Sequence, residues 1–262
     1  TGVTASNKEY DATIAATLTG TAALSGVITA DQANVTLAGT AAATFNNASV
    51  GTNKAVTVTG YTLGGTAAGN YTVSQPIGLT ANIIAKAANT LTIDPIANQT
   101  FTGLALTPAI VVKNGATTLT LGTHYSVAYS NNTNVGTATV TITGIGNYSG
   151  TKTATFSIVA KAASTLTIDP IANQTYTGSA LTPSLVVKDG VTTLTLGTHY
   201  TVTYSNNTNV GAASVMITGM GNYTGTKTGT FSIFIPGPTA VVCCSDLAGT
   251  YAFDALQTFC GK

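Results

Sequence analysis

The side chains best suited to chemistry are few in this chain, and several recur at a fixed interval. His124 and His199 both stand in the sequence LGTHY, 75 residues apart. A histidine can ligate a metal, but a zinc site needs several His or Cys side chains at ligand spacing. Neither histidine has such a neighbour in the sequence. We therefore predict no metal site and no cofactor, and expect each imidazole to form a local hydrogen bond at a strand edge.

Carboxylates and lysines are also sparse. Asp94-Pro95 and Asp169-Pro170 recur, but calcium needs several oxygen ligands and the chain has only eight acidic residues. A lysine–asparagine isopeptide bond needs a buried carboxylate beside the pair, and Asp94 and Asp169 are the only acids shared by both copies. Calcium-stiffened linkers and isopeptide bonds are therefore both disfavoured. The lysines considered for the latter are Lys113, Lys152, Lys188 and Lys227.

Hydrolase and nucleotide chemistry have no matching motif. There is no G-x-S-x-G sequence, and neither histidine belongs to a nucleophile–base–acid set. The glycine-containing segment at 65–70 reads as a hairpin-type turn between strands, not as a phosphate-binding loop before a helix. We predict that the protein is not an enzyme.

All three cysteines lie near the C-terminal end of the sequence. Cys243 and Cys260 could form a disulfide, which would leave Cys244 free or available for an intermolecular bond. Three reduced thiols are the alternative. The same segment contains the apolar run Ala240, Val241 and Val242. We predict that this run is an assembly strand that adds to the sheet edge of a neighbouring subunit.

The elements that carry these side chains form a tandem repeat. Residues 89–159 return at 164–234 with roughly 55 of 71 positions identical, which indicates self-contained modules. Residues 1–86 are a distant relative, because Gly69-Asn70-Tyr71 matches Gly146-Asn147-Tyr148 and Gly221-Asn222-Tyr223. We expect the tyrosine of this landmark to pack on the core and to hydrogen-bond nearby through its hydroxyl.

The repeat unit has the two-residue period of half-buried strands. In 137–143, Ala138, Val140 and Ile142 share one face and threonines the other. Asn114-Gly115 predicts a two-residue hairpin. The fold class is therefore all-β, with three tandem immunoglobulin-like antiparallel β-sandwiches arranged end to end, because the joints lack a Gly/Ser-rich or Pro-rich spacer. The predicted domains are 1–86, 87–160 and 161–235, followed by a cysteine-containing tail, or the start of a further domain, at 236–262.

Composition limits the partners. Only 6% of residues are charged and the net charge is +1, whereas nucleic-acid binding needs a basic face that releases counterions. No uninterrupted apolar stretch is long enough for a membrane-spanning helix. A surface close to neutrality does little to prevent self-association. We predict contact with copies of itself or between neighbouring repeats, and neither nucleic-acid binding nor a membrane span.

Two family resemblances support this fold. Residues 1–86, with KEYDATIAATLTG and VTVTGYTLGG, resemble the YDG-type repeat of large secreted haemagglutinin-like adhesins and keep its Tyr10-Asp11 core. Residues 87–160 and 161–235, with YSNNTNVG, GNYTG and TFSI, resemble the MBG-type bacterial immunoglobulin-like repeat. The resemblance implies extracellular β-sandwich stalks on a bacterial cell surface or in fibres, without catalytic residues.

The predicted function is a structural or adhesive segment of a secreted bacterial surface protein or extracellular fibre, which gives length and repeat valency and self-assembles by strand addition. The alternative is a module that binds carbohydrate or a host protein through SNNTNVG loops or exposed tyrosines. The absence of tryptophan disfavours sugar stacking. A third hypothesis is ice binding by outward threonines, which the twist of sandwich sheets disfavours.

Overall fold

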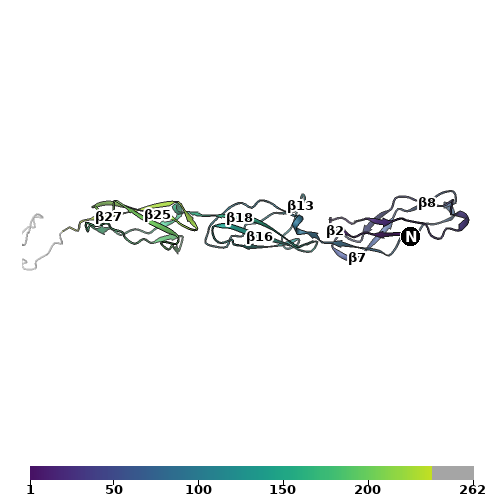
Figure 1. Cartoon of the computed structure of the whole chain (residues 1–262), viewed down its shortest axis with the longest axis horizontal. Coiled ribbons are helices and arrows are strands. Elements are labelled where there is room, and N and C mark those ends of the chain that lie inside the picture. Colours follow the sequence, from purple (N-terminus) through teal and green to yellow (C-terminus); the bar gives the residue numbers. More distant parts are fainter. Residues whose placement is uncertain (238–262) are drawn as a thin grey trace, which may run out of the picture. The chain divides into compact units, whose positions relative to one another are not determined.

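The computed structural model describes residues 1–237 (Figure 1). It consists of β-strands and four short 3-10 turns, which confirms the predicted all-β sandwich class. Internal contacts divide the chain into one unit, Thr1–Lys161, and a second that begins at Ala162. We call residues 1–86 the first module, 87–160 the first repeat and 161–235 the second repeat. The bounds of these domains and their end-to-end order stay predictions. The residues predicted to form a disulfide or an assembly strand (Ala240, Val241, Val242, Cys243, Cys244 and Cys260) lie outside the described residues.

The first repeat folds as two facing sheets. Its main sheet has the strand order β12-β18-β16-β15, and its smaller sheet has the order β11-β13-β14. Its elements are β10 (Lys86–Ala87), η3 (Ala88–Thr90), β11 (Thr92–Ile93), β12 (Gln99–Thr100), β13 (Val112–Asn114), β14 (Thr117–Thr118), β15 (Tyr125–Ser130), β16 (Gly136–Gly144), β17 (Tyr148–Ser149) and β18 (Thr151–Val159).

The core of the first repeat follows the predicted alternation. Ala138, Val140 and Ile142 on β16 are all fully buried. Ile142 belongs to one cluster with Val112 of the smaller sheet, so the cluster joins the two layers. The opposite face of β16 carries threonines that stand directly across from threonines of β18, such as Thr139 opposite Thr155. Threonine favours strand conformation and keeps this face polar without charge.

The predicted hairpin is present, but its turn is shifted by one residue. Asn114 pairs with Thr117, so the two-residue loop is Gly115-Ala116 rather than Asn114-Gly115. Gly115 has a φ of 59°, a left-handed value that glycine adopts without steric cost. The prediction was wrong about Asn114, which ends β13 instead of lying in the turn. Its side chain donates a hydrogen bond to the hydroxyl of Tyr148 at 3.4 Å.

The first module has the same main sheet with one strand added. Its order is β2-β9-β7-β6-β3, in which β2, β9, β7 and β6 correspond to β12, β18, β16 and β15. Two ribbons, β1-β4 and β5-β8, complete it. Its elements are β1 (Val3–Ala5), β2 (Lys8–Glu9), β3 (Ala15–Ala16), β4 (Leu18–Gly20), η1 (Thr29–Asp31), β5 (Thr36–Ala38), β6 (Ala42–Phe45), β7 (Gly51–Thr59), β8 (Thr62–Gly64), η2 (Ala68–Asn70) and β9 (Leu79–Ile84).

The second repeat reproduces the two sheets of the first. Their orders are β21-β27-β25-β24 and β20-β22-β23. Its elements are β19 (Lys161–Ala162), η4 (Ala163–Thr165), β20 (Thr167–Ile168), β21 (Gln174–Thr175), β22 (Val187–Asp189), β23 (Thr192–Thr193), β24 (Tyr200–Ser205), β25 (Gly211–Gly219), β26 (Tyr223–Thr224) and β27 (Thr226–Phe234).

Candidate functional site: the Asn147 joint

Asn147 forms hydrogen bonds at the boundary between the first module and the first repeat. Its side-chain carbonyl accepts a hydrogen bond from the backbone amide of Val50 at 2.9 Å. Its backbone carbonyl accepts another from the amide of Lys86 at 3.0 Å. Asn147 belongs to the Gly-Asn-Tyr turn of the first repeat, and Val50 lies in the turn before β7 of the first module. One side chain thus holds two distant turns together.

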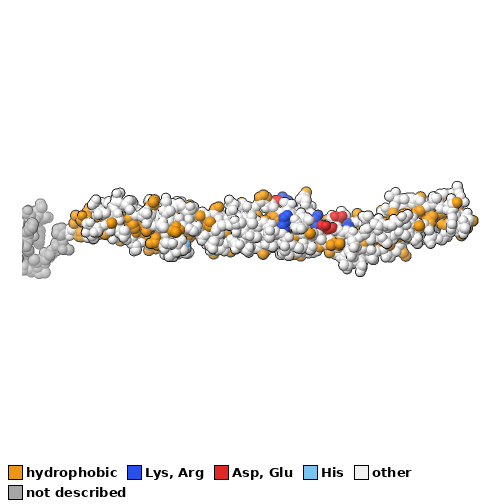
Figure 2. All heavy atoms as spheres, in the orientation of Figure 1, with side chains coloured by type: hydrophobic (Ala, Val, Ile, Leu, Met, Phe, Trp, Pro, Cys, Tyr) orange, Lys and Arg blue, Asp and Glu red, His pale blue; other side chains and the backbone are white. Residues whose placement is uncertain are grey.

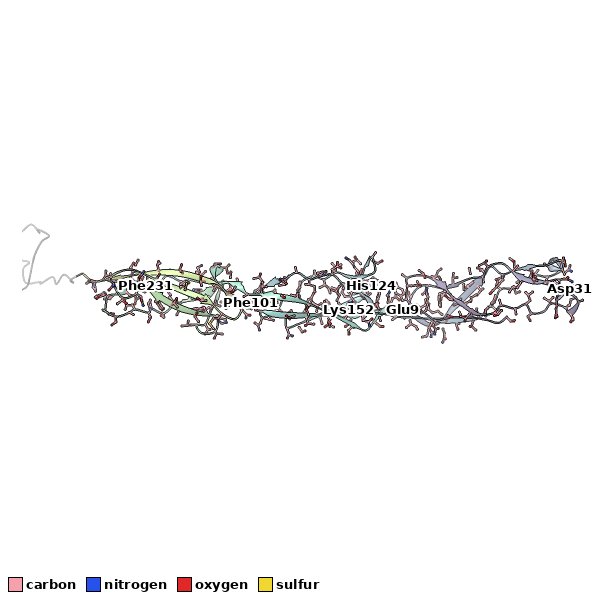
Figure 3. The ribbon with its side chains drawn as sticks, turned by 45° about the horizontal axis from the view of Figure 1, so that its top comes forward. Glu9, Asp31, Phe101, His124, Lys152 and Phe231 are labelled. Atoms are coloured by element: carbon pink, nitrogen blue, oxygen red, sulfur yellow. The ribbon has the colours of Figure 1, made fainter. Side chains whose placement is uncertain are left out.

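The linker itself is paired rather than free. β10, at Lys86–Ala87, runs parallel to β17, at Tyr148–Ser149. Beyond it, the ammonium of Lys152 donates hydrogen bonds to the carbonyls of Asn89, at 3.1 Å, and of Leu91. Figure 3 labels Lys152, which lies on β18 of the first repeat. The linker backbone is therefore fixed by the first repeat from its first residue onward.

An aromatic contact closes the joint. The rings of Tyr10 and Tyr148 meet edge to face, with 5.6 Å between their centroids. Tyr10 packs against the core cluster of the first module and also against that of the first repeat. A side chain shared by two cores couples their packing. We call Tyr10, Val50, Lys86, Asn147 and Tyr148 the Asn147 joint.

Tyr148 is held in place by its own repeat, as the sequence predicted. It is buried, its hydroxyl accepts the hydrogen bond from Asn114, and the ring of His124 lies edge to face at 5.8 Å. The Nδ1 atom of His124 accepts a hydrogen bond from the amide of Thr120 at 2.9 Å. Burial raises the pKa of the Tyr148 hydroxyl. The local role expected for the histidine is confirmed.

The second repeat builds the same support with one chemical difference. His199 accepts from the amide of Thr195 at 2.9 Å, and its ring lies 5.9 Å from that of Tyr223. The hydroxyl of Tyr223 donates to the carboxylate of Asp189 at 3.2 Å, where the first repeat has an asparagine. Burial, the charge of that carboxylate and the hydrogen bond to it raise the pKa of Tyr223 to about 12.

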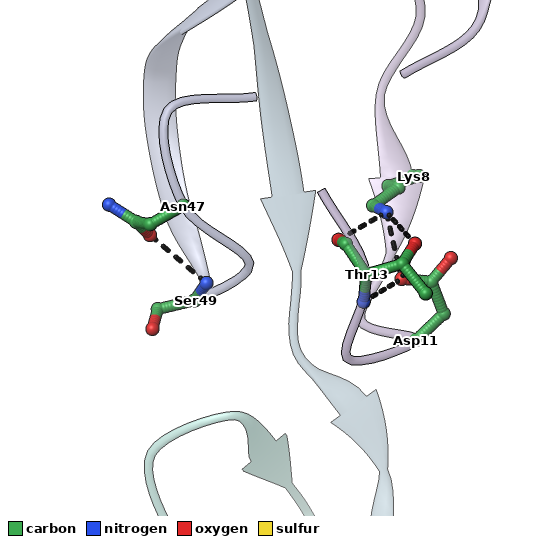
Figure 4. Close-up of polar contacts among 5 residues, drawn as sticks. All are labelled: Lys8, Asp11, Thr13, Asn47 and Ser49. Atoms are coloured by element: carbon green, nitrogen blue, oxygen red, sulfur yellow. Dashed lines mark hydrogen bonds and ion pairs between the residues drawn. The ribbon is translucent and has the colours of Figure 1, made fainter. Parts of the chain in front are cut away.

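Asp11 of the first module forms a small polar cluster with Lys8 and Thr13 (Figure 4). One carboxylate oxygen of Asp11 accepts from Lys8 Nζ at 2.8 Å and from the amide and hydroxyl of Thr13, each at 2.9 Å. Burial acts to raise the pKa of Asp11, but these hydrogen bonds outweigh it and lower the pKa from 3.8 to about 2. The stabilisation they provide is complete above pH 3.8 and is lost as the pH falls to about 2.

The same turn contains a non-glycine residue, Ala12, with a left-handed backbone conformation. Ala12 has a φ of 65°, whereas Gly103 and Gly178, at the corresponding positions of the two repeats, have 84° and 79°. In the repeats a threonine hydroxyl takes the place of the Asp11 carboxylate. The hydroxyl of Thr102 accepts a hydrogen bond from the amide of Leu104, and that of Thr177 accepts one from the amide of Ser179. The turn is therefore common to all three modules, and only the first places a Cβ in the left-handed region.

The lysines considered for isopeptide bonds have other partners. Lys113 forms an ion pair with Asp94 at 2.5 Å and Lys188 one with Asp169 at 2.6 Å, and all four side chains are about one-third exposed. Lys227 donates to backbone carbonyls of its own repeat, as Lys152 does. Figure 2 shows charged side chains gathered on the visible face near β13 and β2. These contacts are ordinary ion pairs and hydrogen bonds.

A groove of about 570 Å³ lies within the first module. Its walls include the extended segments 22–27 and 71–77, which belong to no strand. Half-buried or buried apolar side chains line it, among them Val3, Leu24, Leu37, Tyr61, Leu63 and Val73. We call it the first-module groove. It is concave and lined about equally by polar and apolar surface, which suits a small or extended ligand.

Within residues 1–237 no group of three His, Cys, Asp or Glu side chains is arranged to hold a metal ion. No helix in this part of the chain is long and apolar enough to cross a membrane. The joint itself was not predicted. Two recurring sequence features could have identified it. They are the Gly-Asn-Tyr turns and the Val-Gly pairs at 50–51, 135–136 and 210–211, which mark the two turns that meet.

Comparison with known families supports the first domain. Residues 1–78 match the YDG domain family, in agreement with the resemblance carried by Tyr10-Asp11. Ala12 then stands where the three-letter motif that names the family has glycine. A search of curated proteins found no match to the chain.

Proposed function

We propose that this chain is a structural segment of a secreted bacterial surface protein or extracellular fibre, in which each module adds length and another copy of the same surface. The two repeats would be MBG-type immunoglobulin-like domains that follow the YDG domain. Repetition suits a role in which reach and valency matter more than a single cleft. The observation that carries this proposal is the strand arrangement common to all three modules.

In every module the strand that opens the main sheet lies parallel to the strand that closes it. The pairs are β2 with β9, β12 with β18, and β21 with β27. A backbone hydrogen bond of 2.8–2.9 Å extends each pair, from Tyr10 to Ile84, Phe101 to Val159, and Tyr176 to Phe234. Tension along the chain pulls these neighbours in opposite directions. The tension therefore loads all the hydrogen bonds between the two strands at the same time, instead of breaking them one after another.

Force spectroscopy tests this role. We expect the chain pulled from its two ends to resist more than the first repeat pulled through cysteines at Ser126 and Thr143. These positions pair at the open end of the β15-β16 hairpin, so force there unzips one hydrogen bond after another. The native cysteines would be replaced by serine in both cases. Equal rupture forces in the two directions would contradict a role in resisting tension.

The Asn147 joint supports the same proposal. Because Tyr10 packs on both cores and the linker is paired from Lys86, the first module and the first repeat have little free chain between them to extend. A stalk that transmits force benefits from such a joint. Replacing Asn147 with Ala should increase hydrogen exchange at the amide of Val50. Asn98→Ala, at an exposed position of the first repeat, is the control.

A second candidate function is binding of carbohydrate or a host protein, and the first-module groove is the observation that favours it. Leu24→Asp would place a charge in the groove and should abolish binding on glycan or host-protein arrays. Leu104→Asp, at an exposed position of the first repeat, is the matched control. Failure of the unmodified chain to bind any array component would remove this candidate.

Strand addition by Ala240–Val242 remains part of the proposal for self-assembly. Deleting residues 236–262 should abolish ordered fibres if this run is the assembly strand. Fibres that persist after the deletion would exclude it.

A further inference from the structure

The second repeat exposes the counterpart of a surface that is covered in the Asn147 joint. Tyr176 corresponds to Tyr10, because each donates its amide to the last strand of its module. Val210 corresponds to Val50, because each precedes the glycine that begins the long strand, β25 or β7. Tyr10 and Val50 are half-buried in the joint, whereas Tyr176 is 40% and Val210 52% exposed. The neighbouring Phe234 and Ile235 are exposed as well.

The first module carries the other half of the contact. The amide of Tyr71 donates to the carbonyl of Ala68 at 3.1 Å, as that of Tyr148 donates to Ile145 at 3.2 Å, so the same backbone hydrogen bond closes both Gly-Asn-Tyr turns. The turns differ at the glycine, because Gly146 has a φ of 65° and Gly69 has no positive φ. The Tyr71 hydroxyl donates to Asp31 at 2.9 Å, which anchors the ring as Asn114 does in the first repeat. Asn70 is exposed. Figure 3 places Asp31 at the end of the first module away from Glu9.

We propose that the Asn70-Tyr71 turn of one chain docks on the Tyr176 and Val210 surface of a second copy and reproduces the Asn147 joint between molecules. The Asn70 side-chain carbonyl would accept the amide of Val210, and the ring of Tyr71 would meet that of Tyr176. Since the two surfaces differ, the contact is head to tail, and each bound copy presents a further free surface. The inference deepens the proposed structural role by naming the partner.

One feature of the sequence favours a partner in trans. Position 236 corresponds to Lys86, whose amide donates to Asn147 in the joint, but Pro236 has no amide hydrogen to donate. Residue 236 therefore cannot supply the backbone hydrogen bond that Lys86 supplies in the Asn147 joint.

The contact should be weak and reversible. In the Asn147 joint the covalent linker supplies an effective concentration on the order of millimolar, and a second copy lacks both the linker and the hydrogen bond from position 86. Association is therefore to be sought near millimolar protein. Sedimentation equilibrium of the full chain, with a reductant to prevent cysteine cross-links, should show an average mass that rises above 26.1 kDa with concentration.

Two variants separate the two halves of the contact. Asn70→Ala removes the acceptor and Tyr176→Ala removes the ring, and each variant alone should stay monomeric. A 1:1 mixture should form dimers and nothing larger, because it contains one intact surface of each kind. Both residues are exposed, so the variants should fold, which thermal melting would check. Val186→Ala, at a position 44% exposed in the second repeat, should associate like the unmodified chain.

Several results would overturn the inference. The first is that the unmodified chain stays monomeric near millimolar concentration, or associates only without reductant. The second is that Asn70→Ala or Tyr176→Ala associates like the unmodified chain. The third is that their 1:1 mixture forms assemblies larger than dimers. Loss of association on deletion of 236–262, with Asn70→Ala unaffected, would instead favour strand addition by the tail. None of these results bears on the force-bearing role, which the direction of pulling tests separately.

Discussion

Many internal contacts recur in the two repeats, including some at positions where their residues differ. The hydroxyls of Tyr129 and Tyr204 each donate to a proline carbonyl at 2.5 Å, and Lys113 and Lys188 each pair with an aspartate. Ala154 of the first repeat becomes Gly229 in the second, yet the strand partners Val140 and Val215 are both fully buried. Sequence differences between the two repeats leave the fold unchanged because the buried faces of their strands keep the same residues.

This comparison predicts equal energetic costs at equivalent core positions. Ile142→Ala and Ile217→Ala should each lower the free energy of unfolding by about 2–5 kcal/mol, because both side chains are fully buried. Hydrogen exchange followed by mass spectrometry would assign each loss to its repeat, since many peptides of the two repeats differ in mass. Costs that differ by more than about 1 kcal/mol would mean that the surroundings are not equivalent.

A glycine under the Gly-Asn-Tyr turn provides a smaller and more local test. A Cβ at Gly144 would lie 2.6 Å from the amide nitrogen of Ser149, and one at Gly219 would lie 2.7 Å from that of Thr224. The turn would have to move, at a cost of about 1–3 kcal/mol for Gly144→Ala or Gly219→Ala. Chemical denaturation would measure it.

Gly144→Ala has a second expected effect. Because Asn147 lies in the displaced turn, exchange at the amide of Val50 should also increase. Gly69→Ala is the control, since a Cβ there meets no atom within 4 Å. Unchanged protection of Val50 would mean that the joint does not depend on the position of the turn.

Much of each module could be predicted from local pattern. The alternation in 137–143 identified Ala138, Val140 and Ile142 as buried, because the side chains of a strand alternate between its faces. The shift of the hairpin to Gly115-Ala116 was not predicted, because local pattern does not show that Asn114 pairs in the strand and contacts a tyrosine 34 residues away. The bond from Val50 to Asn147 spans 97 residues. Only the folded sheets bring such turns together.

The first module differs from the two repeats in backbone strain at Ala12. Ala12→Gly should raise the free energy of unfolding by about 1 kcal/mol, because alanine at a φ of 65° pays a steric cost that Gly103 and Gly178 avoid. The gain is reduced by the greater freedom of glycine in the unfolded chain. Thermal melting would detect the change. Gly103→Ala is the matched reverse substitution, and it should destabilise the first repeat by a similar amount.

The smallest expected effect concerns the residue that contacts the tyrosine hydroxyl of the Gly-Asn-Tyr turn, which is Asn114 in the first repeat and the ionisable Asp189 in the second. The pKa of Tyr223 is raised to about 12 by burial and by Asp189. Tyrosine in an unfolded chain has a pKa of about 10. The folded state therefore favours the protonated phenol, and this stabilisation is complete below pH 10 and is lost as the pH rises to about 12.

Exchanging the two partners should exchange this behaviour. Asp189→Asn should make the unfolding free energy of the second repeat less dependent on pH between about 10 and 12, by less than about 1 kcal/mol because the site is near the surface. Asn114→Asp should make the first repeat more dependent, because it places a carboxylate beside the hydroxyl of Tyr148. Hydrogen exchange cannot be measured well at such pH, so urea denaturation followed by circular dichroism is the suitable measurement. Identical pH profiles for Asp189→Asn and the unmodified chain would mean that burial alone raises the pKa of Tyr223.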